Sequence, residues 1–136
     1  MVVYFGFTHC PDVCPTGLAE LAGAMRLLGK DSERVQVLFI TLDPERDTSR
    51  VLAQYVPSFH PAFLELRGNM AETAKTAKEF RVYFHKVPLG DAGNYTVDHS
   101  SHSYAFGPDG RLRLYLRQGI AAQDMAHDLR LLLAGK

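Results

Sequence analysis

The chain is 136 residues long and 46% of its residues are apolar, which is typical of a globular protein and excludes intrinsic disorder. Fifteen basic residues balance fifteen acidic ones, so the formal net charge is zero and neither a nucleic-acid partner nor a polybasic membrane patch is expected. The length fits one domain, residues 1–136, which we expect to be a monomer, and no apolar run approaches the roughly 20 residues of a membrane-spanning helix.

The first third of the chain predicts a strand, a helix and a second strand. Residues 2–7 form a continuous apolar run and predict a fully buried strand. Residues 17–28 carry apolar side chains at helical spacing, and Gly29 is a natural end for that helix. Residues 35–42 form a second apolar run, which predicts a parallel strand covered on both faces.

The middle of the chain predicts two capped helices separated by a short strand. Residues 47–49, Asp-Thr-Ser, can cap a helix that runs to about Tyr55, and residues 63–66 predict the strand. Asn69 can cap the next helix. Its apolar face is expected at Met70, Ala74, Ala77 and Phe80.

The last third predicts a loop, a hairpin and a final helix. Residues 89–95 are polar and contain glycine, so a loop is expected. Residues 103–106 and 112–116 flank Gly-Pro-Asp-Gly at 107–110, which predicts a β-hairpin. Residues 121–133 predict a helix, and its apolar stripe consists of Met125, Leu129 and Leu132.

The order of these elements predicts an α/β fold with a mixed central sheet flanked by helices. Alternating strands and helices favour parallel strands, to which the late hairpin adds an antiparallel edge. A strand that leads into a Cys pair at the start of a helix, followed later by a hairpin and a C-terminal helix, is the layout of a thioredoxin-like fold.

The two cysteines, Cys10 and Cys14, are expected to serve chemistry rather than stability, because a disulfide over so short a loop stabilises a chain little. Residues four apart share one face of a helical turn, and a helix N-terminus favours the thiolate, which is both the nucleophile and the metal ligand. Buried inert cysteines, a redox dithiol and a metal site are the three alternatives.

A metal at this pair would need a histidine as a further ligand. Structural zinc usually takes about four Cys or His ligands, and the chain has no second Cys pair. Soft thiolates with an imidazole suit copper. Six candidates exist: His9, His60, His85, His99, His102 and His127.

His99 is the favoured histidine because it stands just ahead of the predicted hairpin. Asp98 beside it is able to orient its ring. His102 is the rival, and in an extended segment over residues 100–106 these two histidines would point to opposite faces, so that only one of them faces the sulfurs.

Four stretches of the sequence together resemble the Sco (SenC) family of copper proteins, from about residue 2 to the C-terminus. They are Tyr4-Phe5-Gly6-Phe7-Thr8-His9-Cys10-Pro11-Asp12-Val13-Cys14-Pro15, Thr41-Leu42-Asp43-Pro44-Glu45-Arg46-Asp47-Thr48, Tyr95-Thr96-Val97-Asp98-His99-Ser100 and Gly107-Pro108-Asp109-Gly110. The combination is far more specific than any one of the four stretches.

The resemblance implies a thioredoxin-like fold that binds Cu(I) or Cu(II) through Cys10, Cys14 and His99. It implies copper delivery to the binuclear copper centre of cytochrome c oxidase during assembly, with the copper-receiving oxidase subunit as the partner. Some members are instead credited with thiol–disulfide exchange on that subunit or on another copper chaperone, with Cys10 and Cys14 as redox-active thiols. Asp43 matches an acidic position close to the metal and is not expected to be a ligand.

Members of this family carry an N-terminal membrane anchor and outer strands before the Tyr4 segment, and both are expected to be missing from this chain. The resemblance implies a membrane-anchored protein on the periplasmic side of a bacterial inner membrane, or in the mitochondrial intermembrane space. Whether the chain is an enzyme stays open. A metallochaperone is the first hypothesis, a thiol–disulfide oxidoreductase served by a thioredoxin-like reductant the second, and a thiol peroxidase the third.

Overall fold

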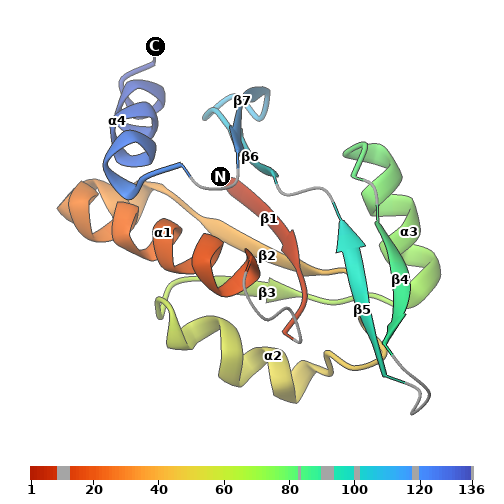
Figure 1. Ribbon diagram of the computed structural model, residues 1–136. Helices are drawn as coiled ribbons and strands as arrows, with labels where there is room; N and C mark the ends of the chain where they lie inside the picture. The colour runs from red at the N-terminus through yellow and green to blue at the C-terminus, as the bar shows by residue number, and fades with distance from the viewer. Residues whose placement is uncertain (9–12, 83, 90–93, 100–101, 118–119, 136) are drawn as a thin grey trace.

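The computed structural model describes residues 1–8, 13–82, 84–89, 94–99, 102–117 and 120–135 (Figure 1). Its strands and helices, in chain order, are β1 (Val2–Gly6), α1 (Val13–Leu28), β2 (Val37–Thr41), α2 (Ser49–Tyr55), β3 (Leu64–Leu66), α3 (Met70–Glu79), β4 (Phe84–Leu89), β5 (Asn94–His99), β6 (His102–Phe106), β7 (Leu112–Arg117) and α4 (Ala122–Leu133). Two short 3₁₀ helices, η1 (Gly29–Arg34) and η2 (Val56–Ser58), follow α1 and α2.

The central sheet is mixed, as expected, with the strand order β3-β2-β1-β6-β7. Strands β1, β2 and β3 are parallel, whereas β6 runs antiparallel to β1 and β7 antiparallel to β6. Every residue of β1 is buried, which fits its place in the middle of the sheet. The predicted α/β, thioredoxin-like arrangement is confirmed, and Figure 1 shows helices on both faces of this sheet.

Two consecutive residues of β1 identify the layers on the two faces of the sheet. Tyr4 contacts α1 at Gly17 and packs against Phe39 of β2, with the ring centroids 6.0 Å apart. Phe5 points to the opposite face and packs edge-on against Phe80, at the end of α3, with a centroid distance of 5.2 Å. Helix α1 and its neighbour α4 therefore cover one face, and α3 covers part of the other.

Helix α1 begins at Val13, four residues before the predicted start at residue 17. Pro15 is its third residue, where a missing N–H breaks no intrahelical hydrogen bond, so the proline is compatible with the first turn. Gly29 ends the helix with a φ of +60°, as predicted, because glycine adopts the left-handed conformation without steric cost.

Helix α3 confirms its predicted cap and corrects its predicted face. Asn69 and Glu72 form a capping box, in which each side chain accepts a hydrogen bond from the other residue's backbone N–H. The buried residues of the helix are Thr73 and Ala77, whereas Ala74, expected on the apolar face, is exposed. The threonine is accommodated in the core because its hydroxyl donates to the Asn69 carbonyl at 2.8 Å.

The loop predicted over residues 89–95 is wrong at both of its ends. Strands β4 and β5 pair as an antiparallel ribbon, with Leu89 opposite Asn94 and Phe84 opposite His99. Residues 95–97, Tyr-Thr-Val, have high β-propensity, so a strand is compatible with their local preference. In Figure 1 this ribbon stands next to α3.

The coverage of β2 differs from the prediction as well. Val37, Phe39 and Thr41 are buried, but the alternate residues Leu38 and Ile40 are half-buried. The latter pair with Leu64 and Leu66 of the edge strand β3, which are 50% and 44% exposed. Because α3 covers only part of this face, β2 is not enclosed on both sides.

The predicted hairpin and C-terminal helix are both confirmed. In the turn at residues 107–110 the N–H of Gly110, whose φ is +78°, donates to the Gly107 carbonyl at 3.0 Å. In α4 the three predicted core residues, Met125, Leu129 and Leu132, are all buried.

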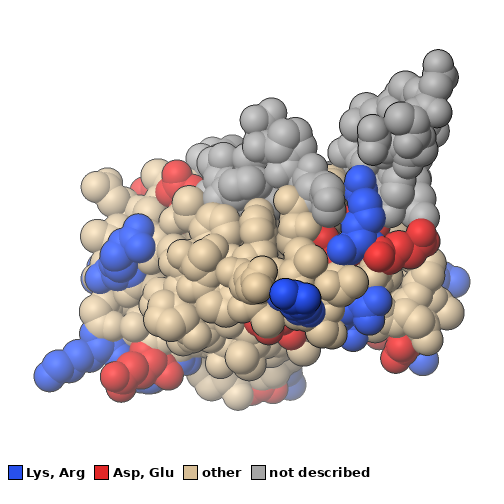
Figure 2. All heavy atoms as spheres, turned by 90° about the horizontal axis from the view of Figure 1, so that it is seen from below, with Lys and Arg blue, Asp and Glu red and all other residues tan. Residues whose placement is uncertain are grey.

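Figure 2 views the molecule from below, the side on which α2 lies in Figure 1. Basic and acidic side chains are scattered over this face and form no broad patch of one sign. Within the described part of the chain no helix is both long enough and apolar enough to cross a membrane.

Candidate metal centre

Three parallel strands deliver polar residues to one edge of the sheet. Strands β1, β2 and β3 all end at this carboxyl edge, and the chain continues from them to Thr8, Asp43 and Arg67 respectively. In open α/β sheets, ligands bind in the crevice outside the carboxyl ends of the strands. In the sequence, Cys10 follows Thr8 by two residues.

Asp47 is the centre of a hydrogen-bond cluster at this edge. Its Oδ2 accepts from the Thr8 N–H at 3.0 Å and from the Thr41 hydroxyl at 2.7 Å. Its Oδ1 accepts from the Thr8 hydroxyl at 2.5 Å. The carboxylate is fully buried, so these donors replace the water that it would otherwise bind.

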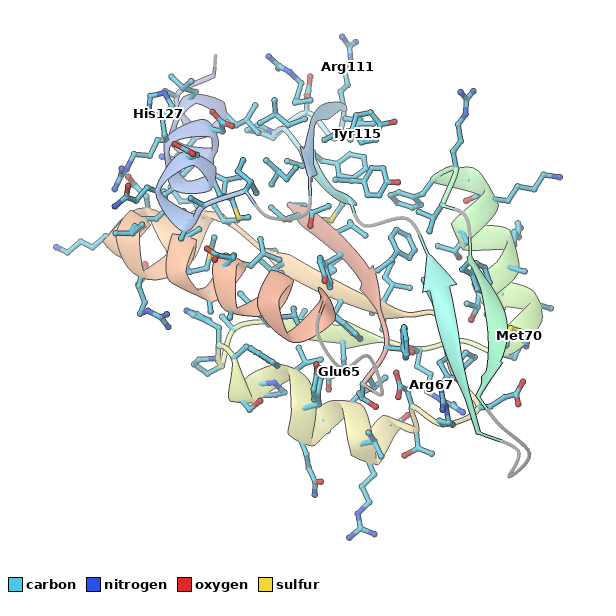
Figure 3. The ribbon with its side chains drawn as sticks, in the orientation of Figure 1. Glu65, Arg67, Met70, Arg111, Tyr115 and His127 are labelled. Atoms are coloured by element: carbon cyan, nitrogen blue, oxygen red, sulfur yellow. The ribbon has the colours of Figure 1, made fainter. Side chains whose placement is uncertain are left out.

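The turn between β2 and α2 is held by two arginines. Arg46 Nε donates to Oδ2 of the buried Asp43 at 2.5 Å, within an ion pair. Arg67, labelled in Figure 3 just past β3, donates from Nε to the Asp47 carbonyl at 2.9 Å and from Nη2 to the Pro44 carbonyl at 2.8 Å. The carbonyls of this turn are thus bound by a cation from the neighbouring strand.

The predicted copper ligands are only partly covered by the described residues. Cys10 lies outside them. Cys14 is the second residue of α1 and His99 is the last residue of β5, but the description does not extend to their side chains. The three-ligand site therefore stays a prediction.

The two rival histidines belong to different strands, which was not predicted from the sequence. His99 ends β5 in the two-stranded ribbon, whereas His102 begins β6 in the main sheet, where it pairs with Arg117. No single strand contains both, so the condition of one extended segment is not met, and the directions of their side chains lie outside the described residues.

The structure also describes the surroundings of two other candidate histidines, His60 and His127. His60 Nδ1 accepts from the Ala62 N–H at 3.1 Å, and its ring stacks on Phe63 at a centroid distance of 5.0 Å. His127 is exposed on α4, and Figure 3 places it far from the labelled Arg67. Among the residues that the structure describes, no group of three or more His, Cys, Asp and Glu could hold a metal ion.

The sequence did not predict the hydrogen-bond cluster at this edge, which is formed by Thr8, Thr41, Asp47 and Arg67. They are separated by up to 59 positions along the chain, and only the strand topology brings them together. The available signal was positional for three of them, because Thr8, Thr41 and Arg67 lie at or just after the end of a predicted strand. Asp47 was expected only as part of a helix cap.

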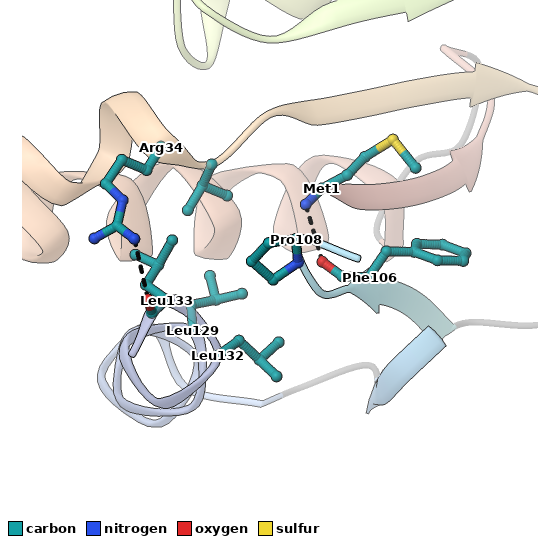
Figure 4. A pocket seen from close by; sticks show the side chains of 8 residues that line it. Met1, Arg34, Phe106, Pro108, Leu129, Leu132 and Leu133 are labelled. Carbon is teal, nitrogen blue, oxygen red and sulfur yellow. Dashed lines mark hydrogen bonds between the residues drawn. The ribbon is translucent and has the colours of Figure 1, made fainter. Parts of the chain in front are cut away.

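An apolar pocket at the opposite edge of the sheet is a separate feature. Met1 lines it at the amino end of β1, together with Leu129 and Leu132 of α4 and Pro108 of the hairpin turn (Figure 4). Because Met1 and Thr8 lie at opposite ends of β1, this pocket is not part of the candidate metal centre.

The fold and the position of the Cys motif define a thioredoxin-like α/β protein whose cysteine pair follows the central strand. A family model described as SCO1/SenC matches residues 1–134. The chain therefore belongs to the SCO1/SenC family.

The similarity extends to curated sequences and solved structures. The mitochondrial SCO2 homolog of Bos taurus is 40% identical over 132 residues, which are 96% of this chain and 50% of that protein. The structure of Bradyrhizobium japonicum ScoI with copper bound has a TM-score of 0.87 and 42% identity, and the match covers 96% of this chain and 83% of that one. The structure of Arabidopsis thaliana ScoI with copper bound has a TM-score of 0.91 and 34% identity, and the match covers 99% of this chain and 84% of that one. The chain spans about half the length of the curated relatives it matches.

Proposed function

We propose that this protein binds copper through Cys10, Cys14 and His99 and delivers it to the copper-receiving subunit of cytochrome c oxidase during assembly. The observation that carries the proposal is the likeness to two structures solved with copper bound, at 42% and 34% identity, over nearly the whole chain. The family resemblance of the sequence motifs supplies the oxidase as the destination.

The chemistry of the proposed ligands fits copper. Two thiolates and an imidazole are soft to borderline donors, which favour copper over Mg²⁺ or Ca²⁺. Cys14 lies in the first turn of the 16-residue helix α1, and this turn contains no acidic residue. The partial positive charge of the helix N-terminus therefore favours the thiolate of Cys14.

Delivery would proceed by ligand exchange. In the reduced protein the thiolates of Cys10 and Cys14 and the imidazole of His99 hold the ion, and protons are released as it binds. Thiolates of the receiving protein then replace these ligands one at a time. Each replacement forms one metal–sulfur bond as another metal–ligand bond breaks, so the metal is not released into water.

Copper titration of the reduced protein tests this proposal, anaerobically for Cu(I) and rapidly for Cu(II). We expect one copper per chain and a sulfur-to-copper charge-transfer band. His99→Ala should weaken Cu(II) binding sharply and remove the band, and His102→Ala, the matched control, should leave both unchanged. A folded, reduced protein that binds no copper would overturn the proposal, and an unchanged His99→Ala variant would overturn the ligand assignment.

A thiol–disulfide exchange role is the second candidate, because the two cysteines suffice for it. Cys10 and Cys14 would pass two electrons to a disulfide in the oxidase subunit or in another copper chaperone. They would form their own disulfide and yield the partner's two thiols. A thioredoxin-like reductant would restore the dithiol. Single Cys→Ser variants that trap a mixed disulfide with the partner would support this role, and failure of both to trap it would exclude it.

We place the native protein outside the cytoplasm, anchored on the periplasmic side of a bacterial inner membrane, with the mitochondrial intermembrane space as the alternative. The names of the mitochondrial SCO2 homologs support the mitochondrial alternative. The family resemblance of the sequence motifs supplies the periplasmic one. Fractionation of the native host, with protease added to intact spheroplasts or mitoplasts, tests the placement, and a protected cytoplasmic protein would refute it.

A further inference from the structure

We propose that Asp47 is a positioning residue for the metal centre, acting through Thr8 on the start of the Cys motif. The inference rests on the proposed copper site and adds to it a residue that is not a ligand. It concerns the point where the chain leaves β1, because Thr8 is the last described residue before Cys10.

Asp47 holds Thr8 by two hydrogen bonds, one to its backbone and one to its side chain. Asp47 binds the Thr8 N–H and the Thr8 hydroxyl with different carboxylate oxygens, at 3.0 and 2.5 Å. A contact to the N–H alone would leave the threonine free to turn about that bond. Two contacts from one carboxylate restrict the direction in which the chain continues toward Cys10.

Asp47 is itself fixed from the neighbouring strands, so it can act as an anchor. The Thr41 hydroxyl, at the end of β2, donates to Asp47 and accepts from the Asp43 N–H at 3.0 Å. The Asp47 N–H donates to the Asp43 carbonyl at 2.8 Å, and Arg67 binds the Asp47 carbonyl. Thr8 is therefore held, through Asp47, in a fixed position relative to the ends of both β2 and β3.

A buried carboxylate adds little to the stability of the fold, because its desolvation offsets much of what its hydrogen bonds contribute. At a metal site, by contrast, residues that orient the ligands raise affinity by fixing geometry before the ion arrives. The location of the cluster, two residues from one proposed ligand, matches this second use.

The test compares three variants that retain Asp47. Thr8→Val keeps the backbone bond to Asp47 and removes the hydroxyl bond, and Thr8→Ser retains both as the conservative variant. Thr73→Val is the matched control, since it also removes a buried threonine hydroxyl bond, but in α3. Copper affinity, the charge-transfer band, the reduction potential of the Cys10–Cys14 pair and urea stability are measured for each.

For Thr8→Val we expect copper affinity to fall about 10-fold, as for other residues that support metal ligands, with a shifted charge-transfer band. Thr8→Ser and Thr73→Val should bind copper like the unaltered protein, even where Thr73→Val lowers stability. Copper binding by Thr8→Val equal to that of the unaltered protein would overturn the inference.

The experiment separates this inference from the proposed function. If the unaltered protein binds no copper, the proposed function fails and the reduction potential becomes the deciding measurement. A potential changed in Thr8→Val and unchanged in Thr73→Val would then support the positioning role. Equal potentials in all three variants and the unaltered protein would refute it.

Discussion

Glycine at position 17 is required by the approach of an aromatic side chain to helix α1. A Cβ placed on Gly17 would lie 2.4 Å from the Tyr4 hydroxyl oxygen and 2.8 Å from its ring. Both residues flank the Cys motif, Tyr4 in β1 and Gly17 in the second turn of the helix. The absence of a side chain at position 17 is thus what lets α1 lie against the central strand.

Gly17→Ala is expected to destabilise the protein by about 1–3 kcal/mol, the usual cost of overpacking. Helix propensity alone would act in the opposite direction by about 1 kcal/mol, so the sign of the change is diagnostic. Urea unfolding measures it. Ala19→Gly, at an exposed position of the same helix, calibrates the propensity effect. A Gly17→Ala variant more stable than the unaltered protein would show that the contact is easily relieved.

Tyr104 provides a titration that reports on the buried aromatic face of the sheet. Burial, and secondarily the charge of the neighbouring Tyr115, raises the pKa of Tyr104 above its usual value near 10. The folded state therefore holds the proton where the unfolded chain has lost it. The stabilisation is complete below about pH 10 and disappears as the pH rises through the folded-state pKa.

We accordingly expect Tyr104→Phe to lose less stability than the unaltered protein when the pH is raised from about 9 to about 11. Urea unfolding at the two pH values gives the comparison. Equal losses would mean that the pKa of Tyr104 is the same in the folded and unfolded states.

At the scale of elements, α3 depends strongly on its N-terminal cap because the helix is only ten residues long. Its capping box satisfies two backbone N–H groups at that end. The far end of the helix leads to Phe80, which packs on Phe5 of the central strand. Loss of the cap would therefore weaken the packing on that face of the sheet.

Asn69→Ala should lower the free energy of unfolding by about 1 kcal/mol, the typical cost of removing an N-cap side chain. Asn69→Asp, which keeps an accepting oxygen, should stay close to the unaltered protein. Thermal and urea unfolding decide between these values. An Asn69→Ala variant of full stability would mean that water replaces the cap without cost.

At the scale of the whole molecule, the sheet closes between distant parts of the chain. Strand β1 pairs with β2 on one side and with β6 on the other, so that Val2 lies opposite both Val37 and Ala105. The C-terminal helix α4 then packs against α1 and buries Leu129 beside the first residues of the chain (Figure 4). We expect such long-range closure to make folding cooperative.

Leu129→Ala should cost about 2–5 kcal/mol, because it removes a buried side chain from this junction. Leu131→Ala, two residues on in the same helix, should change stability by no more than about 0.5 kcal/mol. The two leucines are 3% and 41% exposed. Urea unfolding followed by far-UV circular dichroism and by tyrosine fluorescence should give one coincident transition for each variant. Separate transitions would show that α4 unfolds independently of the sheet.

Local sequence patterns predicted the elements whose signals are local. The apolar run of β1, the cap at Asn69 and the Gly-rich turn of the hairpin all act between residues close in the chain, and the structure confirms each of them. The adjoining ends of β4 and β5 were predicted as part of a loop because the glycine and polar residues at 90–94 outweighed the short flanking strands.

The sequence by itself also determined the family, because the residue types and the spacing of its motifs can be identified without any knowledge of the fold. Only the tertiary structure revealed the cluster that joins Thr8, Thr41, Asp47 and Arg67, and it also separated His99 and His102 into different sheets. The physical reason is that a hydrogen bond depends on distance in space. Parallel strands bring together, at one edge, side chains that lie tens of residues apart in the chain.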